Sequence, residues 1–197
     1  MKRILIGVIM VMTVLNFGGC FSNKSDTNSV VAKTIEWEKN DNGELEFYTN
    51  DTDYKNASYW FVLNSPYEDP MKSFEVYAKK VSGYKDGGYG IIFGVQDNSN
   101  FYRLLITETG FYQVSKKVQD ENTVILNWNR GNNLQTGYGV YNKIKVTYNA
   151  GEFKIYFNDK FENNFTDYQF TKGKYGMYLG VFDENFPKES VDILFAR

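Results

Sequence analysis

Bulky and small side chains alternate along residues 88–117, the most regular stretch of the chain. The alternation breaks at residues 97–100, which are Asp, Asn, Ser and Asn, and again at residues 108–110, which end in glycine. A period of two places every second side chain on one face of a sheet, and polar or glycine-containing breaks of this kind are typical of tight turns. The pattern therefore predicts an antiparallel meander of three strands, over residues 89–95, 101–107 and 111–117.

Similar alternation recurs along most of the remaining chain. It predicts further strands over residues 34–38, 44–49, 58–63, 72–81, 123–128, 142–148, 152–158, 174–183 and 190–196. Residues 64–71, with two of the three prolines, and the polar residues 129–138 are expected to be loops. About a dozen short strands with regular turns and no convincing helix indicate an all-β protein, either an antiparallel sandwich or a barrel.

Two glycines, Gly90 and Gly94, stand in the first strand of the meander. Either a neighbouring strand packs too closely to admit a Cβ atom, or a ligand approaches the backbone there. We expect close packing, because β-sandwich strands often carry glycines for that purpose. In the two strands that follow, we expect Arg103 and Lys116 to lie on solvated faces.

The composition excludes several kinds of site. The 197 residues contain no histidine and a single cysteine, Cys20. This excludes Ser-His-Asp and Cys-His nucleophile systems as usually built, and also the ordinary zinc sites. A formal net charge of −2 without a basic stripe argues against nucleic acid as a partner. No cofactor is predicted, although calcium, which prefers oxygen ligands, remains a candidate.

The N-terminus predicts a cellular location. Lys2 and Arg3 precede an apolar run over residues 4–17, which is too short for a membrane span of about 20 residues and fits a secretory signal. The sequence Phe17-Gly18-Gly19-Cys20 that ends the run resembles the lipobox of bacterial lipoproteins, although Phe17 stands where Leu or Val is usual. The alternative is an ordinary signal peptide with an incidental cysteine.

The lipobox resemblance implies cleavage before Cys20 and acylation of that residue, for example with palmitate. Residues 1–19 would then be a signal peptide, residues 20–33 a flexible lipid-anchored tether and residues 34–197 a β-sandwich domain. Several acyl chains on one cysteine give stable membrane attachment. We therefore expect the protein in the bacterial cell envelope, bound to a membrane through its N-terminal lipid and facing the periplasm or the exterior.

The order of features in the β-rich part resembles the concanavalin A-like lectin and glucanase superfamily, which includes laminin-G-like domains. The resemblance spans residues 44–197 and rests on residues 89–93, 97–102, 110–114, Trp128, 142–146, 153–158 and 173–176. It implies a two-sheet antiparallel jelly roll, whose members bind glycans, bind proteins or hydrolyse glycosidic bonds. The Glu-x-Asp-x-x-Glu strand of the laminarinase-like hydrolases does not occur in the chain.

Candidate ligand-binding residues combine aromatic rings with polar side chains. Sugar sites stack rings on pyranose faces and bond the hydroxyls with Asn, Asp or Arg. Residues 128–133 fit this chemistry best, because a tryptophan enters a polar, glycine-bearing segment. The candidates are Trp60, Trp128, Asn129, Arg130, Asn132, Tyr138 and Tyr141, although most aromatic residues of such a chain must form its core.

Calcium has one candidate site, at Asp97, Asn98 and Asn100, whose oxygens gather in one turn. The plainer interpretation of these residues is a turn that bonds its own backbone without a metal.

These observations predict a lipid-anchored, non-enzymatic binding module, with carbohydrate as the expected ligand. Two alternatives remain open. One is a lipoprotein that binds a protein partner through residues 129–138 or 64–71. The other is a glycoside hydrolase, which would need two carboxylates about 5–9.5 Å apart.

Overall fold

The computed structural model describes residues 37–39, 45–49, 57–62, 71–181 and 191–196. These residues form thirteen β-strands, and none of them lies in a helix long and apolar enough to cross a membrane. The predictions for residues 1–33, including the signal peptide, the tether and Cys20, lie outside the described residues, as does the predicted loop over residues 64–70.

The strands form two antiparallel sheets, which we call sheet A and sheet B. Sheet A has the order β1 (Trp37–Lys39), β2 (Leu45–Thr49), β13 (Val191–Ala196), β4 (Phe74–Ser82), β9 (Asn142–Asn149), β10 (Glu152–Phe157) and β11 (Lys160–Thr166). Sheet B has the order β3 (Ala57–Val62), β12 (Lys174–Val181), β5 (Tyr89–Asp97), β6 (Asn100–Ile106), β7 (Phe111–Val118) and β8 (Glu121–Arg130).

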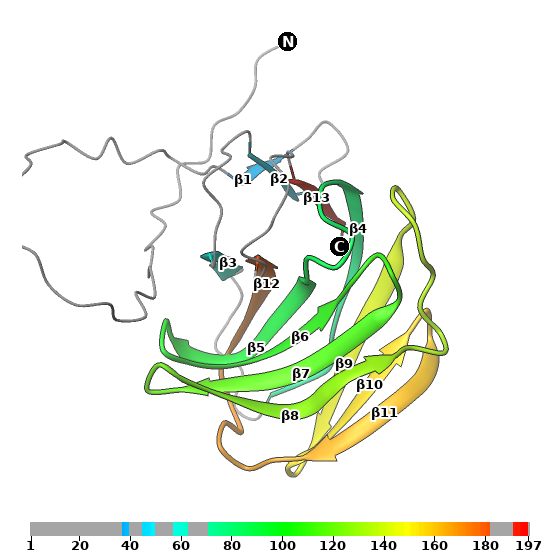
Figure 1. Ribbon diagram of the computed structural model, residues 1–197. Helices are drawn as coiled ribbons and strands as arrows, with labels where there is room; N and C mark the ends of the chain where they lie inside the picture. The colour runs from blue at the N-terminus through cyan, green and yellow to red at the C-terminus, as the bar shows by residue number, and fades with distance from the viewer. Residues whose placement is uncertain (1–36, 40–44, 50–56, 63–70, 182–190, 197) are drawn as a thin grey trace, which may run out of the picture.

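The two sheets pack as layers, with the green strands β5–β8 of sheet B in front of β9–β11 of sheet A (Figure 1). Strands β5, β6 and β7 form the predicted three-strand meander, and β8 adds a fourth strand to it. Strand β12 then inserts between β3 and β5, and β13 inserts between β2 and β4. The expected all-β, two-sheet antiparallel sandwich is confirmed.

The main core lies between the layers and is rich in aromatic rings. Phe93 and Tyr102 of sheet B stack at a centroid distance of 5.3 Å, and Phe93 meets Phe153 of sheet A at 5.7 Å. Phe153 in turn stacks on Phe165 of β11, 4.6 Å away with planes 7° apart. Offset and edge-on ring pairs of this kind add about 0.5–1.5 kcal/mol each beyond their buried area.

Sheet B also buries apolar side chains on its outer face. A second cluster lies there, with Trp60 and Val62 packed against it; its buried members are Ile92, Val95, Phe101, Leu105 and Tyr178. Strands β5 and β6 are therefore covered on both faces, and almost every residue of the two strands is buried. The outer face of sheet B thus has an apolar cluster of its own, in addition to the main core between the two sheets.

Close packing explains both glycines of β5. A Cβ atom at Gly90 would lie 2.2 Å from the carbonyl oxygen of Leu104, in the adjacent strand. Gly94 has a φ of +60°, and a Cβ there would meet Met71, Tyr102 and Phe170 at 3.1–3.3 Å. The prediction that close packing, and not a ligand, requires glycine is confirmed at Gly90, where the atom that excludes a Cβ belongs to the backbone of the neighbouring strand.

The sequence pattern missed one strand. β11 has the sequence KFENNFT, and its polar residues did not suggest a strand. The structure explains this composition, because β11 is the last strand of sheet A and pairs only with β10. Phe165 is its buried anchor, while four of its seven residues are exposed.

Candidate functional site

A pocket of about 470 Å³ opens on the outer face of sheet B. Its size lies within the 300–1,000 Å³ that small-molecule sites usually occupy. The lining provides three aromatic rings, one cation, one carboxylate, one side-chain amide and the hydroxyl groups of two threonines. The lining residues are Tyr84, Asp86, Gly87, Arg103, Thr107, Thr109, Phe111, Gln113 and Trp128. This mixture suits a ligand that has both apolar faces and many hydroxyl groups.

Three adjacent strands and two connections build the pocket. Arg103 of β6 and Gln113 of β7 occupy outward-facing positions of sheet B, and Trp128 comes from β8 at the sheet edge. One wall is the connection between β4 and β5, and another is the turn between β6 and β7, where Gly110 has a φ of +84°. The predicted turn over residues 108–110 therefore frames the pocket.

A β-bulge directs Trp128 into the pocket. Tyr112 pairs with Asn129 and Val114 pairs with Leu126, so β8 has one more residue than β7 between these two pairs. An extra residue shifts the alternation, and bulges commonly re-aim a side chain in this way. The end of the indole ring then reaches Gly88, where a Cβ would lie 3.4 Å from Trp128 Cη2.

Trp128 remains accessible in this position, with 38% of its surface exposed. Phe111 is similarly exposed, at 37%, and the guanidinium of Arg130 lies 6.0 Å from its ring centroid. The pocket therefore offers two accessible rings, those of Trp128 and Phe111, together with its polar groups.

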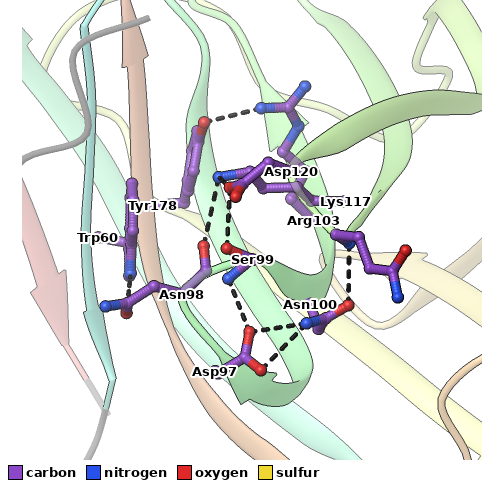
Figure 2. A network of polar contacts seen from close by, with 10 residues as sticks. Trp60, Asp97, Asn98, Ser99, Asn100, Arg103, Lys117, Asp120 and Tyr178 are labelled. Carbon is purple, nitrogen blue, oxygen red and sulfur yellow. Dashed lines mark hydrogen bonds and ion pairs between the residues drawn. The ribbon is translucent and has the colours of Figure 1, made fainter.

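The expectation that Arg103 lies on a solvated face is wrong, since only 8% of the residue is exposed. Its Nε donates a hydrogen bond to Ser115 Oγ at 2.6 Å, and its Nη1 donates one to Tyr178 Oη at 2.7 Å. Figure 2 shows the second of these contacts. The guanidinium is thus fixed in orientation where it lines the pocket. Lys116 is partly buried and forms an ion pair with Asp167 at 2.6 Å.

Beside the pocket, Trp60 covers the outer-face cluster. Its ring stacks on Tyr178 at 6.2 Å with planes 9° apart and contacts Phe101 at 5.9 Å. The Nζ of Lys117 lies 5.8 Å from the Trp60 ring, and Trp60 Nε1 donates a 3.4 Å hydrogen bond to Asn98 Oδ1 (Figure 2). Trp60, on β3 of sheet B, therefore packs against the outer-face cluster of its own sheet and does not line the pocket.

The candidate calcium residues form a hydrogen-bonded turn. Asp97 Oδ1 accepts a bond from the backbone N–H of Ser99 at 2.7 Å, and Asn100 Nδ2 donates to both carboxylate oxygens at 2.9 and 3.0 Å (Figure 2). Asn98 Oδ1 is bonded to Trp60. Within the described ranges, no group of three or more acidic, histidine or cysteine side chains is placed to hold a metal. The turn chemistry matches the plainer interpretation, and a calcium site there stays a prediction.

The remaining predicted ligand-binding residues lie outside the pocket lining. Asn129 Nδ2 bonds the backbone oxygen of Asn127, and Asn132 donates its backbone N–H to Glu162. Tyr138 Oη bonds the backbone oxygen of Gly83, next to the pocket wall. Tyr141 receives the ammonium of Lys79 over its ring at 4.4 Å. Of the predicted ligand-binding residues, the structure thus places only Trp128 in the lining, and Arg130 lies near the lining residue Phe111. The sequence did not indicate the other lining residues.

Comparison with known proteins bears on the fold. The sequence matches no protein-family model and no curated protein. The structure is similar to the carbohydrate-binding module CBM66 from Bacillus subtilis, with a TM-score of 0.59 and 14% identity over 83% of this chain and 92% of that one. It is also similar to a chain from work on endo-acting O-glycanases that human gut microbiota express to initiate mucin breakdown, with a TM-score of 0.55 and 11% identity over 87% of this chain and 83% of that one. At this identity the similarity shows the fold alone: the chain has a jelly-roll β-sandwich fold.

Proposed function

We propose that the protein is a carbohydrate-binding module and that the pocket around Trp128 holds the sugar. One observation carries the proposal: an exposed tryptophan ring shares a pocket with an arginine fixed by two hydrogen bonds. A pyranose presents C–H groups on its faces and hydroxyls at its rim. The Trp128 ring provides an apolar surface for the former, while Arg103, Gln113 and Asp86 offer donors and acceptors for the latter.

The charges in the lining favour an uncharged glycan. Arg103 and Asp86 bring one positive and one negative charge to the pocket wall. Because the two charges offset each other, neither a polyanion nor a polycation gains a general electrostatic advantage. A pair of this kind suits vicinal hydroxyl groups, which both donate and accept. The architecture shared with a carbohydrate-binding module supports the same ligand class.

Binding without hydrolysis is the activity that we propose. A glycosidase of the usual kind places two carboxyl groups on opposite sides of the scissile bond. The described residues that line this pocket include one carboxylate, Asp86, and its Oδ1 accepts a 2.6 Å hydrogen bond from Thr109.

Titration of the purified protein against a panel of soluble polysaccharides and their oligosaccharides, by calorimetry or affinity electrophoresis, tests this function. At least one neutral glycan should bind, and Trp128→Ala should weaken it at least tenfold. Phe161→Ala is the matched control, because Phe161 is 54% exposed on β11 and lies outside the pocket lining. Equal affinities of the Trp128→Ala variant and the wild type, or binding of a protein partner with no glycan bound, would contradict the proposal.

We also propose that Cys20 is acylated and ties the domain to the bacterial envelope. The proposal rests on the charged start, the apolar run and the Gly18-Gly19-Cys20 ending of the N-terminal segment. Cells grown with labelled palmitate should incorporate the label into the wild type and not into Cys20→Ala. A wild-type protein that carries no label and retains Met1 would contradict it.

A further inference from the structure

The connection between β4 and β5 forms one wall of the pocket. It contributes Tyr84, Asp86 and Gly87 to the lining. The segment turns on itself through a 3.0 Å hydrogen bond from the Gly87 N–H to the Tyr84 carbonyl. Its shape therefore decides where three of the lining residues stand.

A buried lysine lies directly beneath this wall. Lys80, near the end of β4, is 1% exposed, and its Nζ donates hydrogen bonds to the carbonyl oxygens of Tyr84 at 2.6 Å and Gly87 at 2.7 Å. A Cβ at position 87 would lie 2.9 Å from that nitrogen, so the glycine leaves room for the ammonium group. One side chain thus links both ends of the turn.

Two carboxylates and an aromatic ring surround the buried Lys80. Glu108 is 4% exposed, accepts a 2.5 Å hydrogen bond from Tyr89 Oη, and donates its backbone N–H to Lys85 O at 3.0 Å. The ring of Tyr89 lies 5.6 Å from the Lys80 nitrogen. Two carboxylates, Glu108 and Asp86, act on Lys80 electrostatically. The wall is therefore held from β4 and from the β6–β7 turn at once.

We propose that Lys80 is a positioning residue for the pocket, which holds residues 84–87 in the conformation that presents Tyr84 and Asp86 to the ligand. The proposal rests on the function proposed above for this pocket. Lys80 itself does not line the pocket, so it acts through the wall. Without the Lys80 nitrogen, the Gly87 carbonyl loses its Lys80 donor and the Tyr84 carbonyl keeps the bond from the Gly87 N–H. A buried carbonyl that loses a hydrogen bond is costly.

Protonation gives this role a distinctive signature. Burial lowers the pKa of Lys80 from 10.5 to about 8, although Glu108 and Asp86 act to raise it. When the wall opens and water reaches Lys80, its pKa returns toward the ordinary value. Between these two values the closed wall binds fewer protons than the open one, so closure is favoured as the pH rises. The equilibrium constant for opening the wall, which is the ratio of open to closed molecules, should therefore fall about tenfold between pH 7 and pH 9.

Amide hydrogen exchange of the ligand-free protein, measured by NMR, tests this directly. The protection factor of the Gly87 amide should rise about tenfold from pH 7 to pH 9 in the wild type, while amides of β10 provide the internal reference. Lys80→Met should lower the protection of Gly87 and remove the pH dependence. Lys79→Met is the matched control, because the adjacent lysine points to Tyr141 instead.

Glycan affinity provides the second measurement. Lys80→Met should bind the glycan at least tenfold more weakly than Lys79→Met. Constant protection of Gly87 across this pH range in the wild type would overturn the proposal even if Lys80→Met fails to fold. Amide exchange is measured without ligand, so it tests the role of Lys80 independently of glycan binding. A wild type that binds no glycan would contradict the proposed function, and the exchange data alone would then decide whether Lys80 holds the wall.

Discussion

Arg103 and Tyr178 are 75 residues apart in sequence, yet the guanidinium of the first donates a 2.7 Å hydrogen bond to the hydroxyl of the second. The guanidinium carbon also lies 5.3 Å from the Tyr178 ring centroid. Tyr178 belongs to β12, which pairs with β5, whereas Arg103 belongs to β6 on the other side of β5. The strand order therefore decides which side chain orients the cation of the pocket.

Tyr178→Phe should weaken glycan binding about threefold to tenfold, because Arg103 then keeps the bond to Ser115 but loses a charge-assisted one of about 1.5–3 kcal/mol. Calorimetric titration of the glycan provides the measurement. Tyr156→Phe, on the outer face of sheet A, is the control and should bind as the wild type does. Unchanged affinity in Tyr178→Phe would show that the hydroxyl does not orient the pocket.

Gly90→Ala should destabilise the fold by about 1–3 kcal/mol, the usual cost of overpacking a tight interior. The added methyl group would lie 2.2 Å from the carbonyl oxygen of Leu104, so the backbone of two paired strands has to shift. Urea unfolding monitored by tyrosine and tryptophan fluorescence measures the loss. A stability within 0.5 kcal/mol of the wild type, on the order of an ordinary surface substitution, would contradict the close approach.

Gly88→Ala should behave differently, because the atoms that its methyl group meets belong to side chains. Leu105 Cδ1 would lie at 3.1 Å and Trp128 Cη2 at 3.4 Å, and both can move. We expect a smaller loss of stability than in Gly90→Ala and a severalfold loss of glycan affinity, since the methyl group would stand against the indole ring that lines the pocket. Urea unfolding and glycan titration of both variants distinguish an effect on packing from an effect on binding. A larger loss of stability in Gly88→Ala than in Gly90→Ala would contradict the view that the side chains around Gly88 can move aside.

Asp167→Asn should destabilise the protein by about 1–3 kcal/mol at pH 7. Its carboxylate accepts hydrogen bonds from Tyr102 Oη and Lys116 Nζ, both at 2.6 Å. Burial acts to raise the pKa of Asp167, but the bonds from Lys116 and Tyr102 outweigh it and hold the pKa below 3.8. The stabilisation is therefore present above pH 3.8 and is lost as the pH falls through the lowered value.

Urea unfolding of Asp167→Asn and the wild type at pH 7 and near pH 2 checks this sign, since the difference between them should shrink in acid. Asp159→Asn is the control, because Asp159 is 66% exposed where it pairs with Lys143 and such pairs contribute little. A difference that is constant with pH would mean that the charge of Asp167 is not what stabilises this contact.

The strands could be predicted wherever burial on one face imposes alternation. Residues 142–148 and 152–158 were expected as strands, and β9 and β10 match them within one residue. Strand β11 was not predicted, because only Phe161 and Phe165 are apolar along it and an edge strand tolerates polar residues. Local pattern thus reveals a strand in proportion to how much of it the fold buries.

The pocket was harder to predict because its parts are set by pairing. Trp128 was singled out for its chemistry, but strict alternation places it on the face of Leu126, and only the bulge opposite β7 turns it outward. Arg103 was expected in solvent, because the residues near it in the sequence do not indicate that Tyr178, 75 residues away, contacts its guanidinium. Both depend on contacts between distant strands, which composition and period do not specify.

Trp128 stands on β8, the last strand of sheet B, and the other walls are two short connections. Most of the surface that we propose for sugar binding is thus separate from the rings packed between the layers. Ligand preference can diverge in related chains by changes at this periphery alone, so two homologues with identical interiors need not recognise the same saccharide.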